Sequence, residues 1–170
     1  MTLAAIAVAA LVLAACGGSD DNGTATTANA SNAGTQSGVV SVDNIDGTEV
    51  LADSQGHTLY SADVEKGGQI MCTSSCTSIW KPASASAKQA RSASAQLDLE
   101  LGAVKRPDGG QQLTFKGMPL YSFTEEGAGQ LTGDGVADSF NGTDFVWTSA
   151  TTGASTGSSD SSAPSSSSPY

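Results

Sequence analysis

Two short stretches of this 170-residue chain are nearly identical: GHTLYS at residues 56–61 and GMPLYS at residues 117–122. They begin 61 positions apart, and in both a glycine leads into Leu-Tyr-Ser. Such repetition indicates an internal duplication in which each copy is a turn, a strand and a loop. A unit of this size has one apolar face that it cannot cover alone. We therefore expect the two copies to pack face to face, or side by side in one sheet, around a shared core.

The likeness between the copies continues beyond these six residues. An acidic residue follows five positions after each tyrosine, and each half ends in a tryptophan. The copies span about residues 45–82 and 97–148. The aromatic residues are expected to supply much of the buried area. The repeat positions are Gly56, Leu59, Tyr60, Glu65, Trp80, Gly117, Leu120, Tyr121, Phe123, Glu126 and Trp147.

Apolar and polar residues alternate in short runs between residues 38 and 148, a pattern that predicts strands. The runs cover residues 39–42, 49–52, 58–61 and 97–101. Turn signals lie between them, at 46–47, 55–56, 107–110, 116–117 and 141–142. The best hairpin joins residues 103–106 to 112–115. The sequence predicts a mainly β fold class, a small antiparallel β domain built from two related repeats.

Helices are expected to contribute little to this domain. A short helix is predicted at residues 74–80, ended by Pro82. Residues 83–96 (ASASAKQARSASAQ) could form a surface loop or a frayed helix. The frequent serines favour the loop.

The first residues of the chain indicate export. Residues 1–15 form an apolar run that ends in small residues, which is typical of a secretory signal peptide. LAAC at residues 13–16 resembles the lipobox of bacterial lipoproteins, in which the cysteine, here Cys16, is lipidated. No Lys or Arg precedes Cys16, so we expect the true start to lie upstream. The alternative is a buried apolar helix with a free cysteine.

Two polar segments flank the domain. Residues 16–37 begin with the lipidated cysteine and continue as a tract of small polar residues, and residues 149–170 form a Ser-rich tail. Neither can bury enough apolar surface to offset the entropy of ordering, so both are predicted to be disordered. The first would hold the domain away from a membrane.

The charge of the chain excludes one class of partner. The formal net charge is −10, with 17 acidic and 7 basic residues, and the basic residues form no cluster in the sequence. Counterion release from nucleic acid therefore cannot drive binding, and no nucleic-acid partner is expected.

The three cysteines divide into one lipid site and one pair. Cys72 and Cys76 would lie in an oxidising compartment, where a disulfide is the default. A redox motif would have two intervening residues, and a metal site would need more thiolates or histidines than this chain holds. Both remain as alternatives, and no cofactor is predicted.

Further motifs follow these in a fixed order, and together they resemble one family. The order is G-x-x-L-Y, C-x-x-x-C, W-x-P, R-x-D-G with a following Gln, G-x-P-L-Y and TGDGV, over roughly residues 40–147. It resembles the bacterial lipoproteins described as a "secreted repeat of unknown function", or by a Yx(FWY)xxD motif. The residues that carry it outside the repeat positions include Pro82, Arg106, Asp108, Gly109, Gln112, Pro119 and 132–136.

The chain departs from that pattern at a few positions. Ala62 stands where the first copy should have an aromatic residue, glutamate replaces aspartate at Glu65 and Glu126, and Lys81 replaces a proline. The change at Ala62 would weaken any function that needs an aromatic residue there. The resemblance implies a β-rich secreted domain on a lipid anchor, and it implies no established activity.

Two kinds of chemical site were weighed. A tyrosine near a buried carboxylate could act in acid–base catalysis, but the simpler interpretation is a hydrogen bond that fixes each loop. Soft ligands could form a copper-like site, since His57 and Met118 occupy equivalent places in the two copies and would be close if the copies pack symmetrically. The weak metal candidates are His57, Met71 and Met118 for copper, and Asp134, Asp138, Asn141 and Asp144 for calcium.

Two functions remain. The first is a non-catalytic envelope lipoprotein, anchored on the outer side of the cytoplasmic membrane or in the outer membrane, that binds a cell-wall component or an envelope protein. It predicts an apolar or aromatic surface patch without convergent titratable groups. The alternative is a redox- or metal-handling secreted lipoprotein that uses the cysteine pair or His57 and Met118.

Overall fold

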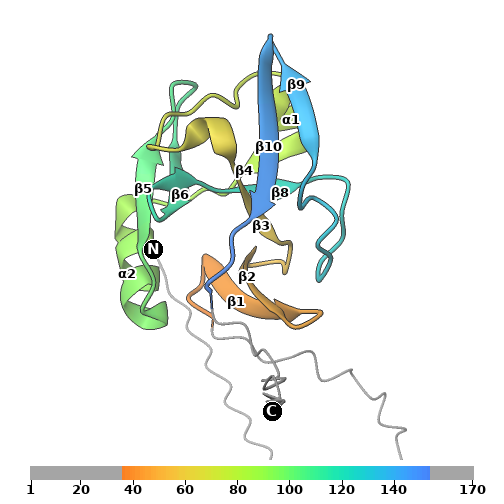
Figure 1. Ribbon diagram of the computed structural model, residues 1–170. Helices are drawn as coiled ribbons and strands as arrows, with labels where there is room; N and C mark the ends of the chain where they lie inside the picture. The colour runs from red at the N-terminus through yellow and green to blue at the C-terminus, as the bar shows by residue number, and fades with distance from the viewer. Residues whose placement is uncertain (1–35, 154–170) are drawn as a thin grey trace, which may run out of the picture. The chain divides into compact units, whose positions relative to one another are not determined.

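The computed structural model describes residues 36–153 (Figure 1). The predictions for the signal peptide, for Cys16 and for most of both tails concern residues outside this range. Within it, no helix is long and apolar enough to cross a membrane. The fold is mainly β with antiparallel sheets, as the alternating pattern predicts.

Ten strands and three short helices lie within residues 36–153. The strands are β1 (Val40–Ile45), β2 (Thr48–Asp53), β3 (Leu59–Ala62), β4 (Trp80–Pro82), β5 (Leu101–Lys105), β6 (Gln111–Phe115), β7 (Met118–Pro119), β8 (Tyr121–Phe123), β9 (Ala137–Phe140) and β10 (Thr143–Ser149). The helices are the 3-10 helix η1 (Asp63–Glu65), α1 (Cys76–Ile79) and α2 (Ala87–Leu97).

Tight turns join most neighbouring strands, as the turn signals predict. The DG, KG and NG pairs each connect two strands with both residues at positive φ, as in Asn141 (52°) and Gly142 (79°) between β9 and β10. Positive φ at both positions matches the right-handed twist of a hairpin. The PDGG turn joins β5 to β6, with Ala103 opposite Leu113, which confirms the predicted hairpin.

The central sheet has the order β4-β8-β3-β10-β9, and every pair in it is antiparallel. In Figure 1, β9 and β10 run side by side as a long hairpin. Two smaller sheets, β1-β2 and β5-β6-β7, complete the fold.

The order of elements is similar in the two halves of the domain. Hairpin β1–β2 is followed by β3, and hairpin β5–β6 is followed by β7 and β8, in the same order and at nearly the same spacing. Paired backbone also continues past residue 148, since Ser149 belongs to β10 and Thr151 bridges to Val50.

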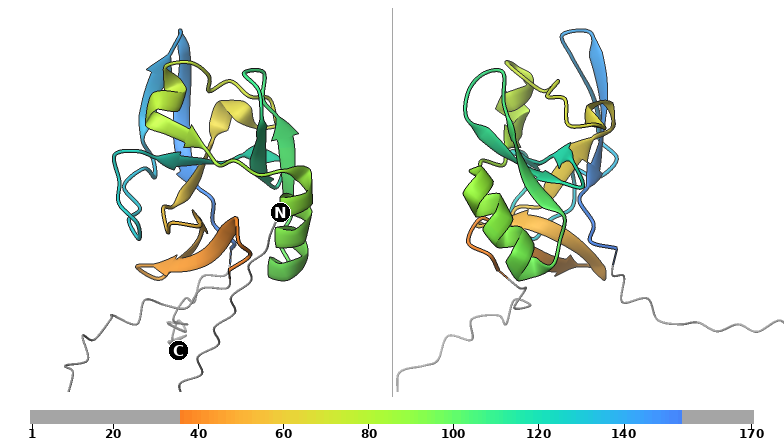
Figure 2. Two further views of the ribbon diagram at one scale, coloured as in Figure 1. Left: turned by 180° about the vertical axis from the view of Figure 1, so that it is seen from behind. Right: turned by 90° about the vertical axis from the view of Figure 1, so that its left-hand side faces the viewer.

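The prediction of a loop at residues 83–96 is wrong, because α2 occupies Ala87–Leu97. Ser86 and Gln89 form a capping box at its start. This Ser-x-x-Gln pattern is visible in the sequence and predicts the start of a helix. Ala90 and Ala93 are fully buried, so their small side chains let the helix lie close against the β5–β6 hairpin (Figure 2). The strand predicted at residues 97–101 is also wrong except at Leu101, where β5 begins. Leu97 is the last residue of α2, and Asp98 ends the helix in a left-handed conformation.

Two cores lie on opposite faces of β3 and β8. Alternation along a strand sends the leucine of each Leu-Tyr pair to one face and the tyrosine to the other. Leu59 and Leu120 join an aliphatic core with the α2 alanines, whereas Tyr60 and Tyr121 join an aromatic core. The same Leu-Tyr pair occurs twice because two copies of one strand form the centre of the molecule.

Candidate functional site

The two copies are related by an approximate two-fold arrangement centred on β3 and β8. Tyr60 lies directly opposite Tyr121 in this antiparallel pair. Each outer strand then pairs with the central strand of the other copy: β10 places Trp147 opposite Ala62, and β4 places Trp80 opposite Phe123. The copies therefore do not sit beside each other as closed units, since each completes the sheet of the other.

The tryptophans stack on each other at the centre of the aromatic core. Their ring centroids are 3.9 Å apart with planes 11° from parallel. Tyr60 meets Trp80 edge-on at 5.5 Å, and Tyr121 meets Trp147 edge-on at 5.2 Å. All four side chains are fully buried. The expectation that the repeated aromatics supply the shared core is met by this cluster.

The missing aromatic at Ala62 is compensated from another strand. In the second copy, Phe123 stacks on Trp80 at 4.5 Å. In the first copy, Phe145 of β10 lies parallel to Trp147 at 5.7 Å and is itself buried. Because Phe145 fills this role, the departure at Ala62 leaves the core packed.

The Tyr–Glu pairs form hydrogen bonds, and they cross between copies. The Tyr60 hydroxyl donates to Glu126 (2.8 Å), and the Tyr121 hydroxyl donates to Glu65 (3.0 Å). Spacing within a copy cannot show this exchange. It follows from the antiparallel pairing, which brings the end of each central strand to the loop of the other copy.

Each glutamate also holds its own loop. Glu65 accepts from the backbone N–H groups of Met71 (2.6 Å) and Cys72 (2.8 Å). Glu126 accepts from the backbone N–H groups of Thr132 (2.9 Å) and Gly133 (3.2 Å). The loops of both copies are therefore closed onto buried carboxylates.

Gly133 is required by its contact with the core. A Cβ atom at this position would lie 2.8 Å from Cζ of Tyr60, closer than side chains approach. Its N–H also donates to the hydroxyl of Tyr60 (3.2 Å). The TGDGV motif thus serves the packing of the aromatic core.

Burial changes the pKa values of Glu65 and of the two tyrosines. Desolvation raises the pKa of Glu65, although hydrogen bonds from the Cys72 and Met71 N–H groups oppose it. Burial also raises the pKa of Tyr60 and of Tyr121, and the carboxylate facing each tyrosine adds to the effect. Glu65 has no solvent exposure. A substrate could not reach this carboxyl group without opening the core.

Glu65 makes stability depend on pH. The folded state holds its proton more tightly than the unfolded chain, whose pKa is near the ordinary 4.5. Its contribution to the free energy of unfolding is therefore largest below 4.5 and decreases as pH rises through the raised pKa. We expect Glu65→Gln to reduce the loss of stability as pH rises above 4.5, measured by urea denaturation. Substitution of the exposed Glu125 by Gln is the control, and an unchanged pH profile in Glu65→Gln would contradict the expectation.

Cys72 and Cys76 form a disulfide, as expected, with Cα atoms 5.3 Å apart. Both cysteines are fully buried in the aromatic core. A redox partner therefore has no direct access to either sulfur in the folded state.

Arg106 organises a buried polar network next to the disulfide. Its guanidinium donates to the Cys72 carbonyl (2.9 Å), to Gln112 Oε1 and, through two nitrogens, to Asp108 (2.6 and 2.7 Å). Gln112 passes the network on, donating to the Leu120 carbonyl (2.7 Å). The hydrogen bond from Arg106 lowers the pKa of Asp108. The R-x-D-G and Gln motif thus ties the second hairpin to the disulfide loop of the first copy.

The copper candidates are not brought together. Antiparallel pairing places equivalent residues side by side only at Tyr60 and Tyr121, so His57 and Met118 lie toward opposite ends of the paired strands. The His57 ring contacts the Asp53 carboxylate (3.3 Å), whereas Met118 lines a pocket. Met71 is exposed.

The calcium candidates serve the fold in different places. Asp134 accepts from the Ser149 N–H (2.7 Å), and Asp138 accepts from Nε1 of Trp80 (2.7 Å). Asn141 forms the β9–β10 turn, where Asp144 pairs with Ser139. Among residues 36–153, no three His, Cys, Asp or Glu side chains gather as a metal site would require.

The predicted apolar or aromatic surface patch is not found in the part of the chain that the structure describes. The large hydrophobic residues exposed there are Val64, Met71 and Val146, and none is aromatic. The aromatic side chains were needed inside, between the copies.

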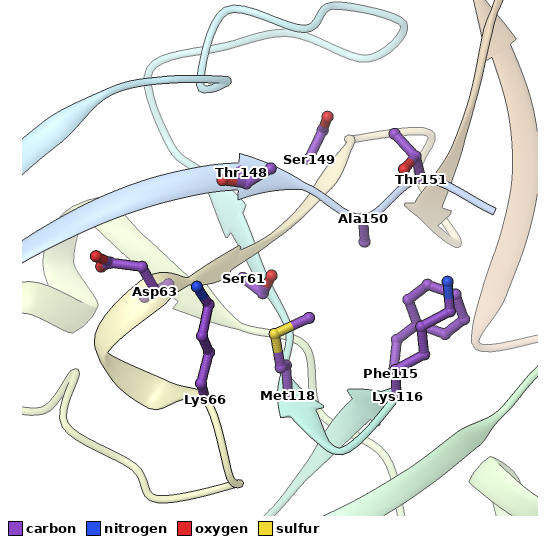
Figure 3. Close-up of a pocket in the computed structure, with 11 residues that line it drawn as sticks. Ser61, Asp63, Lys66, Phe115, Lys116, Met118, Thr148, Ser149, Ala150 and Thr151 are labelled. Atoms are coloured by element: carbon purple, nitrogen blue, oxygen red, sulfur yellow. The ribbon is translucent and has the colours of Figure 1, made fainter. Parts of the chain in front are cut away.

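A pocket that sequence reasoning missed lies where β3, β7 and the end of β10 meet (Figure 3). Its volume is about 320 Å³, at the lower end of the range for small-molecule sites. The apolar part of its wall consists of Ala62, Phe115, Met118 and Ala150. The polar part consists of Ser61, Asp63, Lys66, Lys116, Thr148, Ser149 and Thr151. No signal in the sequence could have shown it, because its residues come from three stretches of the chain that lie far apart in sequence, 61–66, 115–118 and 148–151.

One comparison with known proteins matches part of the chain. The family model described as a secreted repeat of unknown function matches residues 102–143, which begin in β5 and end at the start of β10. This is the family that the sequence motifs resemble. No curated protein and no solved structure matches the chain.

Proposed function

We propose that this chain, which carries the secreted repeat at residues 102–143, is a non-catalytic lipoprotein of the bacterial cell envelope that binds a cell-wall component. The family is described as secreted, and the lipobox at Cys16 extends this to a lipid anchor. Two or more acyl chains on one residue are enough for stable attachment to a membrane.

One observation supports a binding function above catalysis. The side chains best suited to chemistry are used inside the fold: Tyr60 and Tyr121 with the opposite glutamates, and Arg106 with Gln112. The pocket, by contrast, presents two lysines and several hydroxyl groups without a buried acid–base pair. Such a lining is suited to holding a charged group, and its one carboxylate, Asp63, already accepts hydrogen bonds from the backbone N–H groups of Val64 and Val146.

The redox or metal alternative has weaker support. It requires accessible sulfurs or a convergence of His57 with Met118, and the buried disulfide and the antiparallel pairing argue against both. The partner is proposed to be a wall component and not a protein surface because large exposed hydrophobic residues are few in the described range.

The test uses the full chain with Cys16→Ala, which removes the lipid and leaves the domain intact. We expect this variant to cosediment with purified insoluble peptidoglycan in a saturable way, and soluble peptidoglycan fragments to release it.

A second experiment tests the lipid anchor. Wild-type chain expressed with an alkyne analogue of palmitate should be labelled, whereas Cys16→Ala should not. Failure to cosediment would overturn wall binding, and label retained in Cys16→Ala would overturn the anchor at Cys16.

A further inference from the structure

The pocket between β3, β7 and β10 concentrates positive charge in an acidic protein. Acidic residues outnumber basic ones by 17 to 7, yet the pocket is lined by Lys66 and Lys116 with a single acid, Asp63. In Figure 3, the two lysine side chains lie on either side of Met118. The pocket lining thus has more basic than acidic residues, unlike the whole chain, and this favours the binding of an anion.

Both lysines are without an ionic partner in the described range. The ion pairs among residues 36–153 are His57 with Asp53 and Arg106 with Asp108. The Lys116 ammonium lies 4.7 Å from the centre of the Phe115 ring, and no carboxylate pairs with it. Their charges are therefore available to a ligand.

The acid in the pocket wall is already engaged. Oδ1 of Asp63 accepts from the backbone N–H groups of Val64 (2.8 Å) and Val146 (2.9 Å). This holds the carboxylate against the edge of β10. Asp63 thus fixes one wall of the pocket, and the two lysines outnumber this single carboxylate in the lining.

The apolar part of the pocket wall indicates what the uncharged part of the ligand is like. Ala62, Phe115 and Ala150 are buried apolar residues that contribute to it, and Met118 is half-buried. Ser61 is 6% exposed and adds a hydroxyl group to this wall. A bare inorganic ion would leave this apolar wall unused, whereas an anion with a short apolar body would cover it.

We propose that this pocket binds an organic carboxylate with a short apolar body, the positive charges of Lys66 and Lys116 attracting the carboxylate and Phe115 and Met118 contacting the apolar part. This inference rests on the proposed binding function and names the chemistry of its ligand. The carboxylate could belong to an aliphatic acid or to the carboxyl terminus of a short peptide of small residues.

The experiment is a titration of the isotopically labelled full chain with Cys16→Ala, followed by backbone amide chemical shifts. The probes are hexanoate and N-acetyl-alanyl-alanine, each compared with its neutral amide. We expect saturable shifts at Ser61, Met118 and Thr148 with at least one carboxylate, and weaker binding of the matching amide. The stronger carboxylate identifies the source of the ligand.

Substitutions separate the pocket from general charge attraction. Lys66→Gln and Lys116→Gln should each weaken carboxylate binding about five-fold, as expected for one charge contact near water. Lys81→Gln removes an exposed lysine outside the pocket and should leave binding unchanged. Equal binding of acid and amide, or equal effects of all three substitutions, would overturn the proposal. Because the titration uses no wall material, carboxylate binding without cosedimentation would refute the wall partner and leave the pocket ligand standing.

Discussion

Replacing Trp147 by alanine should destabilise the domain by about 3–5 kcal/mol. The side chain is fully buried, stacks on Trp80 and Phe145, and receives the edge of Tyr121. Its removal leaves a cavity where the two copies meet, and the surrounding rings belong to three strands, β4, β8 and β10, that cannot all move inward. Small domains have a total stability of about 5–15 kcal/mol, so this single change removes a large share of it.

The measurement is urea denaturation followed by circular dichroism, with the free energy of unfolding extrapolated to water. Val146→Ala is the matched control, because Val146 is the preceding residue of the same strand and is 43% exposed. It should cost less than about 1 kcal/mol. Similar losses in the two variants would show that the stacked tryptophans do not hold the copies together.

Replacing Arg106 by methionine should cost about 2–5 kcal/mol, since methionine keeps much of the side-chain volume but makes none of the hydrogen bonds. The substitution leaves Oε1 of buried Gln112 and the carbonyl of Cys72 without their donor. Each buried acceptor left unsatisfied costs about 1–3 kcal/mol. Asp108 is exposed enough to be solvated and adds less.

Lys105→Met is the control for the loss of a positive charge, because Lys105 is the exposed neighbour of Arg106. It should change the free energy of unfolding by no more than about 0.5 kcal/mol. Arg106→Lys should give an intermediate loss, because a single ammonium cannot reproduce the two-pronged contact with Asp108. If Arg106→Met cost as little as Lys105→Met, the network would be incidental to the fold.

Several features of the fold follow from the sequence alone. Asp46, Lys116 and Asn141 each precede a glycine, and these pairs form the tight turns that such dipeptides favour. The Leu-Tyr alternation places leucines and tyrosines on opposite faces of a strand whatever its neighbours are. The repeated phrase also predicts two copies packed either face to face or side by side in one sheet, and the pairing of β3 with β8 is the second arrangement. These features depend on residues within a few positions of one another.

Local sequence patterns gave wrong predictions where packing against distant segments determined the structure. Serine-rich residues 83–96 suggest a loop by composition, but Ala90 and Ala93 let a capped helix pack against the second hairpin. Ala62 suggests a defect in the first copy, but Phe145 from a distant strand fills the space. In both cases the deciding contact is with a segment that the local pattern does not contain.

The tertiary structure alone decided how the copies are joined and where a ligand could bind. Sequence spacing links Tyr60 with Glu65 in one copy, but the hydrogen bonds join Tyr60 to Glu126 and Tyr121 to Glu65, across 66 and 56 residues. The exchange arises because antiparallel pairing of two equal strands brings each tyrosine to the other copy's loop. The same pairing moves His57 away from Met118 and gathers Lys66 and Lys116 at one pocket. Strand pairing over such separations is set by the burial of both cores at once, and no short stretch of sequence records it.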